Sequence, residues 1–176
     1  NGQRQAMFLE NTVGLADRIL RNFELSEDDA ALVISSSGCN VVPIEMAARL
    51  QAARMKVVAL VSQQHSQASS SNHPDGVKLT DFADLVLDTG APEGDAMVAI
   101  SGLDTPVSPG STVGGCMLVN ALKAAVAERL VAGGRPPLVL TSGAVVGPER
   151  SQELFESAYD EHGRLAAKVL RGRAIE

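Results

Sequence analysis

Aromatic residues are scarce in this chain. Its 176 residues include no Trp, one Tyr and four Phe, so aromatic residues make up only 3% of the sequence. A core must therefore be built from aliphatic side chains. Hydrophobic residues at 45% and charged residues at 20% are typical of a globular protein. At this length we expect one domain that buries about two-thirds of its unfolded surface.

Cysteine, basic runs and long apolar stretches are also rare or missing. Cys39 and Cys116 are too few for a disulfide framework and form no CxxC pair, which favours a reducing, cytoplasmic setting. The net charge of −6 without a long basic run argues against a nucleic-acid partner. No apolar run approaches the roughly 20 residues of a membrane helix, so we expect no membrane partner. The first residue is Asn1, so we expect a processed or trimmed chain, or part of a longer one.

Apolar runs alternate between strand-like and helix-like patterns along the chain. The predicted strands are residues 31–35, 56–62, 84–90 and 96–100, with 135–143 as a last strand or an extended arm. The predicted helices are residues 5–23 with an interruption, 41–54, 80–83, 111–132 and 149–173. This alternation predicts an α/β fold with a parallel sheet covered on both faces. In such sheets a ligand binds at the carboxyl ends of the strands.

Small polar residues fill the join between the first predicted strand and the helix after it. They are Ser35, Ser36, Ser37, Gly38, Cys39 and Asn40. Free N–H groups at a helix N-terminus favour phosphate or carboxylate, and hydroxyl groups add charge-assisted hydrogen bonds. The join contains neither GK[ST] nor GxGxxG, which argues against a nucleotide. The alternative is plain capping of the helix by Ser37 or Asn40.

Four segments resemble a known family. The stretch ISSSGCNVVPIEMA resembles the sugar-phosphate-binding loop of SIS (sugar isomerase) domains, in which a strand ends in S-x-S-G and the next helix begins near a Pro. More narrowly, VSQQHSQASSSNHPDGVKL, DTGAPEGDA and GSTVGGCMLVNALKAAVAERL resemble a phosphosugar isomerase or phosphoheptose isomerase-like subgroup. The resemblance covers roughly residues 15–150.

The resemblance implies a fold and an assembly. It implies a three-layer sandwich with a parallel sheet of about five strands, forming a single SIS-like domain over residues 1–176 with a terminal helix at 149–173. It also implies a homodimer or homotetramer with the site near a subunit interface. SIS domains begin with a further helix, strand and Ser/Gly-rich turn that have no counterpart before Asn1. We therefore expect the full-length chain or another chain to supply that portion.

The resemblance also implies which residues bind the ligand, with a sugar phosphate as the small-molecule partner and no cofactor or metal. Matched position by position, the phosphate- and sugar-binding residues are Ser35, Ser36, Ser37, Gly38, Asn40, Ser62, Ser111 and Thr112. For Ser111 the alternative is a helix N-cap.

Candidate catalytic residues are less sharply defined. His65 and His73 share a polar loop predicted to lie at the strand ends, and histidine suits proton transfer near neutral pH. Both could equally form hydrogen bonds within the loop, or hold a metal together with Asp75, although their spacing is weak support for that. Glu45 follows the serine-rich join and could face the site or the solvent. Asp95 is either a turn-former or an acid of the site.

Three function hypotheses follow. An aldose–ketose isomerase needs a base, commonly Glu, and an acid for the sugar oxygens. Phosphoheptose isomerases use an early Glu and a His on the long C-terminal helix, and the predicted helix 111–132 contains no His. The isomerase therefore stands beside a non-catalytic sugar-phosphate-binding or regulatory module. The third hypothesis is a fragment that folds only within an oligomer and carries no complete site.

Overall fold

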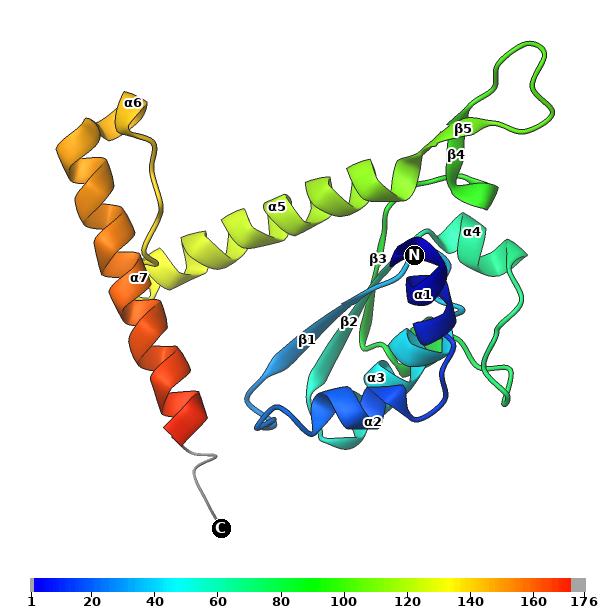
Figure 1. The fold of residues 1–176 in the computed structure, drawn as a ribbon, viewed down its shortest axis with the longest axis horizontal. Coiled ribbons are helices and arrows are strands. Elements are labelled where there is room, and N and C mark those ends of the chain that lie inside the picture. Colours follow the sequence, from blue (N-terminus) through cyan, green and yellow to red (C-terminus); the bar gives the residue numbers. More distant parts are fainter. Residues whose placement is uncertain (1, 172–176) are drawn as a thin grey trace. The chain divides into compact units, whose positions relative to one another are not determined.

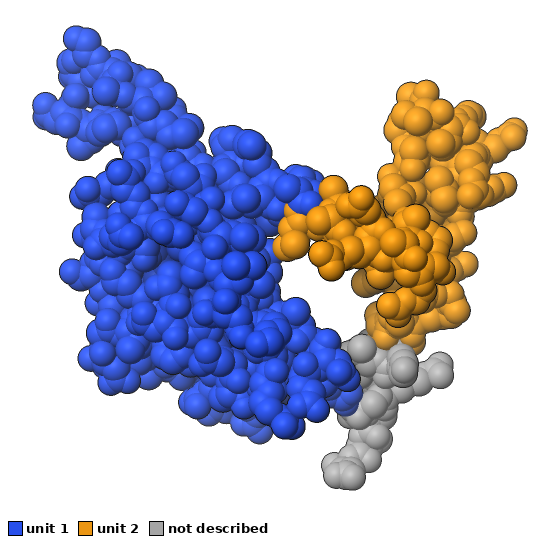
Figure 2. Space-filling model, turned by 180° about the vertical axis from the view of Figure 1, so that it is seen from behind, with its two compact units in different colours: residues 1–121 blue, residues 122–176 orange. Residues whose placement is uncertain are grey.

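The chain falls into two compact units. The computed structural model describes residues 2–171, and the units are Asn1–Ala121 and Leu122–Glu176 (Figure 2). The first unit contains all the strands found among the described residues, and the long helix α5 (Gly110–Ala132) passes from the first unit into the second (Figure 1). The two units are described separately.

A parallel three-stranded sheet forms the centre of the first unit. Its strands are β1 (Ala30–Ile34), β2 (Lys56–Val61) and β3 (Leu85–Asp88), in the order β1-β2-β3. The near-continuous aliphatic runs predicted these strands correctly, and the α/β class is confirmed. The sheet is smaller than the expected five strands.

The fourth predicted strand does not join this sheet. β4 (Ala96–Val98) pairs antiparallel with β5 (Val107–Pro109) in a hairpin that extends away from the sheet (Figure 1). A parallel neighbour requires a crossover of about a dozen residues, and only residues 89–95 separate β3 from β4. Residues 135–143 form no strand, and the Pro pair there cannot donate ladder hydrogen bonds.

The helices follow the predicted ranges, and three further short helical elements, at residues 63–68, 93–95 and 143–146, lie where no helix was predicted. The helices are α1 (Gly2–Leu9), α2 (Leu15–Leu20), α3 (Val41–Ala52), α4 (Gln63–Ala68), the short 3-10 turns η1 (Leu79–Phe82) and η2 (Glu93–Asp95), α5, α6 (Gly143–Val146) and α7 (Pro148–Arg171). The predicted helix 5–23 is divided because Gly14 has a left-handed φ of 78° at the N-cap of α2. α4 lies in a segment expected to be a loop. Residues 172 and 173 of the predicted terminal helix lie outside the described residues.

The core lies between α3 and one face of the sheet, and α2 also lies on this side (Figure 1). It is built from the buried aliphatic residues Ile44, Ala47, Leu50, Met55, Val57, Ala59, Val61 and Leu79. On the other face, Leu60 is 1% exposed and faces the first turns of α5, whereas Ile34 and Leu85 are 55% and 53% exposed. Within the first unit, the expected covering of both faces is therefore complete on the α3 side and partial on the α5 side.

An ion pair joins β2 to the start of β3, at the end of the sheet opposite the serine-rich join. The Asp84 carboxylate accepts hydrogen bonds from the Lys56 ammonium at 2.7 Å and from the Val57 N–H at 2.9 Å. The bond from Lys56, followed by that from Val57, lowers the pKa of Asp84 below its ordinary value.

Glycines bring the first turns of α5 close to the strand ends. A Cβ added at Gly114 would lie 2.4 Å from the Thr89 carbonyl oxygen, and one at Gly110 would lie 2.9 Å from Met97 Sδ. The absence of side chains therefore places the α5 backbone directly against the end of β3. By length and composition α5 is also apolar enough to cross a membrane, contrary to the expectation that no apolar run approaches that length. Its close packing on Thr89 leads us to treat it as a helix of the folded unit.

We expect Gly114→Ala to reduce the free energy of unfolding by about 1–2 kcal/mol. Overpacking costs about 1–3 kcal/mol, whereas the gain in helix propensity is at most about 1 kcal/mol. Gly115→Ala is the matched control, because its new Cβ would lie 3.8 Å from Leu60 Cδ2, an ordinary contact. Urea denaturation should show the control to be neutral or more stable. A neutral Gly114→Ala would contradict the close approach to Thr89.

Candidate functional site

A cavity lies at the carboxyl ends of all three parallel strands. It has a volume of about 200 Å³ and is lined by Ile34, Ser35, Ser36, Leu60, Thr89, Ser111 and Thr112. Five of these residues carry hydroxyl groups. The structure thus brings together four predicted binding residues from the end of β1 and the start of α5. Thr89 was not among the predicted binding residues, because a single Thr after a strand carries no distinguishing signal.

The serine loop, residues 35–40, bonds much of its own backbone. Ser35 Oγ accepts the Gly38 N–H and Ser37 Oγ accepts the Cys39 N–H, both at 3.2 Å. Gly38 has a left-handed φ of 66°, which allows the turn. The hydroxyl groups of Ser35 and Ser37 therefore stabilise the conformation of the loop itself. Of these two residues, only Ser35 also lines the cavity.

Ser36 differs from its neighbours. Its Oγ is buried, and no hydrogen-bond partner for it exists within the part of the chain that the structure describes. A buried polar atom without a partner costs about 1–3 kcal/mol. Because Ser36 lines the cavity, a bound ligand is a partner that would remove this cost.

The start of α5 is held by an acid. The Asp95 carboxylate accepts the Ser111 N–H at 2.6 Å and the Ser111 hydroxyl at 2.5 Å. Asp95 has a left-handed φ of 60°, a conformation that Asp adopts more readily than most residues. Asp95 is thus both a turn residue and an acid next to the cavity, and its carboxylate caps α5.

Ser62 and His65 lie beside the cavity without lining it. Ser62 is fully buried, and its Oγ donates to the Ala91 carbonyl at 2.6 Å while accepting the His65 N–H at 3.1 Å. Its one proton is therefore used within the protein. His65 Nδ1 accepts the Gly94 N–H at 3.0 Å, which fixes the residue just before Asp95.

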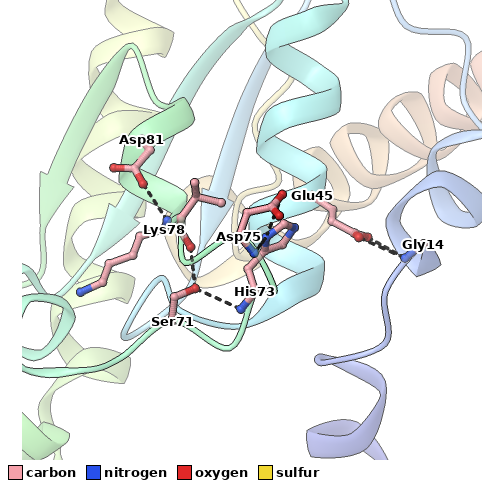
Figure 3. A network of polar contacts seen from close by, with 8 residues as sticks. Gly14, Glu45, Ser71, His73, Asp75, Lys78 and Asp81 are labelled. Carbon is pink, nitrogen blue, oxygen red and sulfur yellow. Dashed lines mark hydrogen bonds and ion pairs between the residues drawn. The ribbon is translucent and has the colours of Figure 1, made fainter.

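His73 and Glu45 occupy a different place from the one expected. They share a second cavity of about 250 Å³ with Arg49 and Asp75. Glu45 is turned toward Gly14 and accepts its N–H with both oxygens, at 2.9 and 3.1 Å, while His73 lies beside Asp75 (Figure 3). The structure therefore does not bring these two residues to the serine-loop cavity. A helix rotates each residue by about 100°, and Glu45 faces α2 instead of the strand ends.

The Asn40 side chain forms hydrogen bonds with two side chains that were not predicted from the sequence. Its amide nitrogen donates to the Glu10 carboxylate, and its amide oxygen accepts from Asn72 at 3.0 Å. The Glu10 carbonyl also accepts the Val42 N–H at 2.9 Å, so the N-terminus of α3 has partners within the protein. No local pattern marks Glu10, because its importance depends on contact with a loop 30 residues away in the chain.

The structure does not assemble the alternative metal set of His65, His73 and Asp75. His65 bonds to Gly94, whereas His73 and Asp75 lie in the second cavity. Among residues 2–171, no three His, Cys, Asp or Glu side chains are grouped so as to hold a metal ion.

Comparison with known proteins agrees with the resemblance of the serine loop. Residues 1–62 match the family model described as SIS domain. A UPF0309 protein from Halalkalibacterium halodurans is 37% identical over 155 residues, which cover 88% of this chain and 64% of that protein. A UPF0309 protein from Streptomyces griseus is 37% identical over 139 residues, which cover 79% of this chain and 55% of that protein.

A third relative is covered more completely. A UPF0309 protein from Brucella anthropi is 32% identical over 165 residues, which cover 94% of this chain and 67% of that protein. The chain thus spans between 55% and 67% of the length of these three relatives. The expected family agrees with the SIS domain match of residues 1–62, and the chain belongs to the UPF0309 proteins.

Proposed function

We propose that this chain binds a sugar phosphate in the cavity at the ends of β1, β2 and β3. The observation that carries the proposal is Ser36, which lines the cavity and whose buried Oγ has no partner in the described residues. Hydroxyl groups from three separate segments line the same cavity. The SIS domain match over residues 1–62, which include the serine loop, supports a phosphosugar as the ligand.

Hydroxyl donors at the β1 end are suited to a phosphoryl group. Ser35 Oγ accepts a backbone N–H, so its own proton is available, and the Ser36 proton is available as well. Hydrogen bonds from hydroxyl groups to a charged oxygen are short and about twice as strong as neutral ones. We therefore place the phosphoryl group beside Ser35 and Ser36.

The finer proposal is an aldose–ketose isomerase. This reaction needs a base next to the sugar carbons. None of the described residues that line the cavity is an acid or a histidine. Glu10 does not line the cavity, but its carboxylate is bonded to the serine loop through Asn40, and we propose it, in place of Glu45 and His73, as the base for a sugar that extends past this loop.

A non-catalytic binding or regulatory module is the second candidate, and the absence of a base from the described cavity lining favours it. As further proposals we retain a homodimer or homotetramer, a cytoplasmic location, and completion of the site by residues of the full-length protein or of another chain.

The test is binding by the wild type and by Ser36→Ala. A ligand at 100 times its dissociation constant adds about 2.7 kcal/mol to the free energy of unfolding, which a thermal melt detects readily. We expect sugar phosphates, and not the unphosphorylated sugars, to raise the melting temperature. Ser36→Ala should weaken binding about 10-fold or more, because a hydrogen bond to a charged group contributes about 1.5–3 kcal/mol.

The same variant has a second readout that requires no ligand. Without ligand, Ser36→Ala should be as stable as the wild type or more stable by about 1 kcal/mol, because it removes an unpaired buried hydroxyl. Ser62→Ala is the control: it leaves the Ala91 carbonyl and the His65 N–H without their partner, and should lose about 1–3 kcal/mol. Equal losses in the two variants would contradict the assignment of Ser36.

Turnover is tested separately from binding. Sugar phosphates that bind are incubated with the protein in D₂O, and NMR follows both ketose formation and deuterium incorporation at the sugar carbon. Conversion by the wild type that falls at least 100-fold in Glu10→Gln, with binding retained, supports the isomerase. Binding without conversion supports the non-catalytic module.

A further inference from the structure

We infer that the cavity is polarised, so that its α5 end presents a hydrogen-bond acceptor and selects a free ligand hydroxyl in place of a second phosphoryl group. This inference deepens the proposed sugar-phosphate function and rests on it. It narrows the ligand class to sugar monophosphates that carry an unsubstituted hydroxyl opposite the phosphoryl group.

The acceptor is Ser111 Oγ. A serine hydroxyl has one proton and two lone pairs, and a carboxylate can only accept. The 2.5 Å bond between Ser111 Oγ and Asp95 Oδ2 therefore uses the serine proton. Because Ser111 also lines the cavity, its oxygen can offer only lone pairs there. A sugar hydroxyl can donate to these lone pairs, whereas a fully ionised phosphoryl group cannot.

The opposite end has the reverse character. Ser35 Oγ accepts the Gly38 N–H and keeps its proton, and Ser36 Oγ has no partner among the described residues. The β1 end thus offers donors and Ser111 offers an acceptor, while the hydroxyl groups of Thr89 and Thr112, which also line the cavity, can donate or accept. Electrostatic repulsion favours the same orientation of the ligand. A phosphoryl group bound at Ser111 would lie close to the negatively charged Asp95 carboxylate, which is bonded to the same hydroxyl group.

Asp95 is held in place from two sides. Its Oδ1 accepts the Ser111 N–H at 2.6 Å, which aligns the carboxylate with the first turn of α5. The backbone next to Asp95 is also held, because His65 Nδ1 accepts the N–H of Gly94, the residue before Asp95. The acceptor character of Ser111 is therefore fixed by neighbouring elements and does not depend on a free side chain.

Asp95→Asn tests the inference with little change in shape. Asn adopts the left-handed backbone at least as readily as Asp, and its oxygen can still accept the Ser111 N–H. Its NH₂ then faces Ser111 Oγ and donates to it, which turns the serine proton toward the cavity. Asp88→Asn is the control for loss of one negative charge at the same sheet edge, because Asp88 accepts the N–H groups of Gln63 and Gly90.

The experiment measures dissociation constants by calorimetry for two matched pairs of probes. The pairs are fructose 6-phosphate with fructose 1,6-bisphosphate, and ribulose 5-phosphate with ribulose 1,5-bisphosphate. For the wild type and Asp88→Asn we expect the monophosphate to bind at least 10-fold more tightly than its bisphosphate. In Asp95→Asn this preference should fall at least 5-fold, while inorganic phosphate binds as in the wild type within 2-fold.

A second variant supports the result if Asp95→Asn folds poorly. Ser111→Ala keeps the backbone N–H that Asp95 bonds, removes the acceptor, and should weaken the monophosphate about 5-fold without weakening inorganic phosphate. An unchanged preference in both variants, or equal weakening of both members of a pair, overturns the inference alone. Failure of the wild type to bind any of these phosphates overturns the proposed function and the inference with it.

Discussion

Leu60→Ala is expected to reduce the free energy of unfolding by about 2–5 kcal/mol, the range for removing a buried leucine side chain. Leu60 is 1% exposed, and its Cδ2 lies 3.8 Å from the position of a Cβ at Gly115 of α5. It therefore fills the space between β2 and α5, where the glycine-rich helix has no side chain to move into the gap. The loss should be measured by urea denaturation.

The same substitution should also weaken ligand binding, because Leu60 is an apolar wall of the candidate cavity. Leu85→Ala is the matched control: it removes the same atoms from the neighbouring strand, where the side chain is 53% exposed. We expect it to cost about 0.5–1 kcal/mol, since exposed positions tolerate truncation. Equal losses at the two positions would show that α5 does not cover Leu60 in solution.

Gly38→Ala should be nearly as damaging, with a loss of about 2–4 kcal/mol. The left-handed φ of 66° costs a residue with a Cβ about 1–2 kcal/mol. In addition, the new Cβ would lie 3.2 Å from Val61 Cγ1 and 3.3 Å from Leu79 Cβ, so neighbouring core atoms must move. Movement of Gly38 would also shift Ser35, which bonds its N–H, so sugar-phosphate affinity should fall about 10-fold.

Gly76→Ala separates the two causes. Gly76 has a similar φ of 72°, but nothing lies within 4 Å of its added Cβ. Gly76→Ala should therefore reduce the free energy of unfolding only by the about 1–2 kcal/mol that a left-handed backbone costs a residue with a Cβ. If Gly38→Ala were no less stable than Gly76→Ala, the serine loop would not be packed against β2 and η1 as described.

The order of strands and helices was accessible from the sequence because each element satisfies its own local pattern. The aliphatic runs at 31–35 and 56–62 have no polar face, which suits strands buried in a parallel sheet. The hairpin of β4 and β5 was not predicted, because a run as short as AMVAI does not indicate its pairing partner. α4 was missed for a related reason: its cap, Ser62, had been assigned to a ligand.

The same contrast between local sequence pattern and contact in space applies to the candidate site. Local spacing placed Ser35 and Ser36 at a site, because the ends of parallel strands meet at one edge, and the SIS resemblance added Ser111 and Thr112. It could not separate Ser36 from Ser37, since neighbouring residues in a loop differ only in the direction of their side chains. It also grouped His73 and Glu45 with the serine loop, because distance along the chain says little about which face of a helix a residue occupies.

The sequence alone determined the α/β class, the serine-rich join after the first strand, and the SIS family, because these depend on residues that are neighbours in the chain. Only the tertiary structure decided which hydroxyl group lacks a partner and which one Asp95 holds. The hydrogen-bonding state of a side chain depends on atoms from segments far apart in the chain. Ser36 and Ser111 look alike in the sequence, and only their neighbours in space make one a free donor and the other an acceptor.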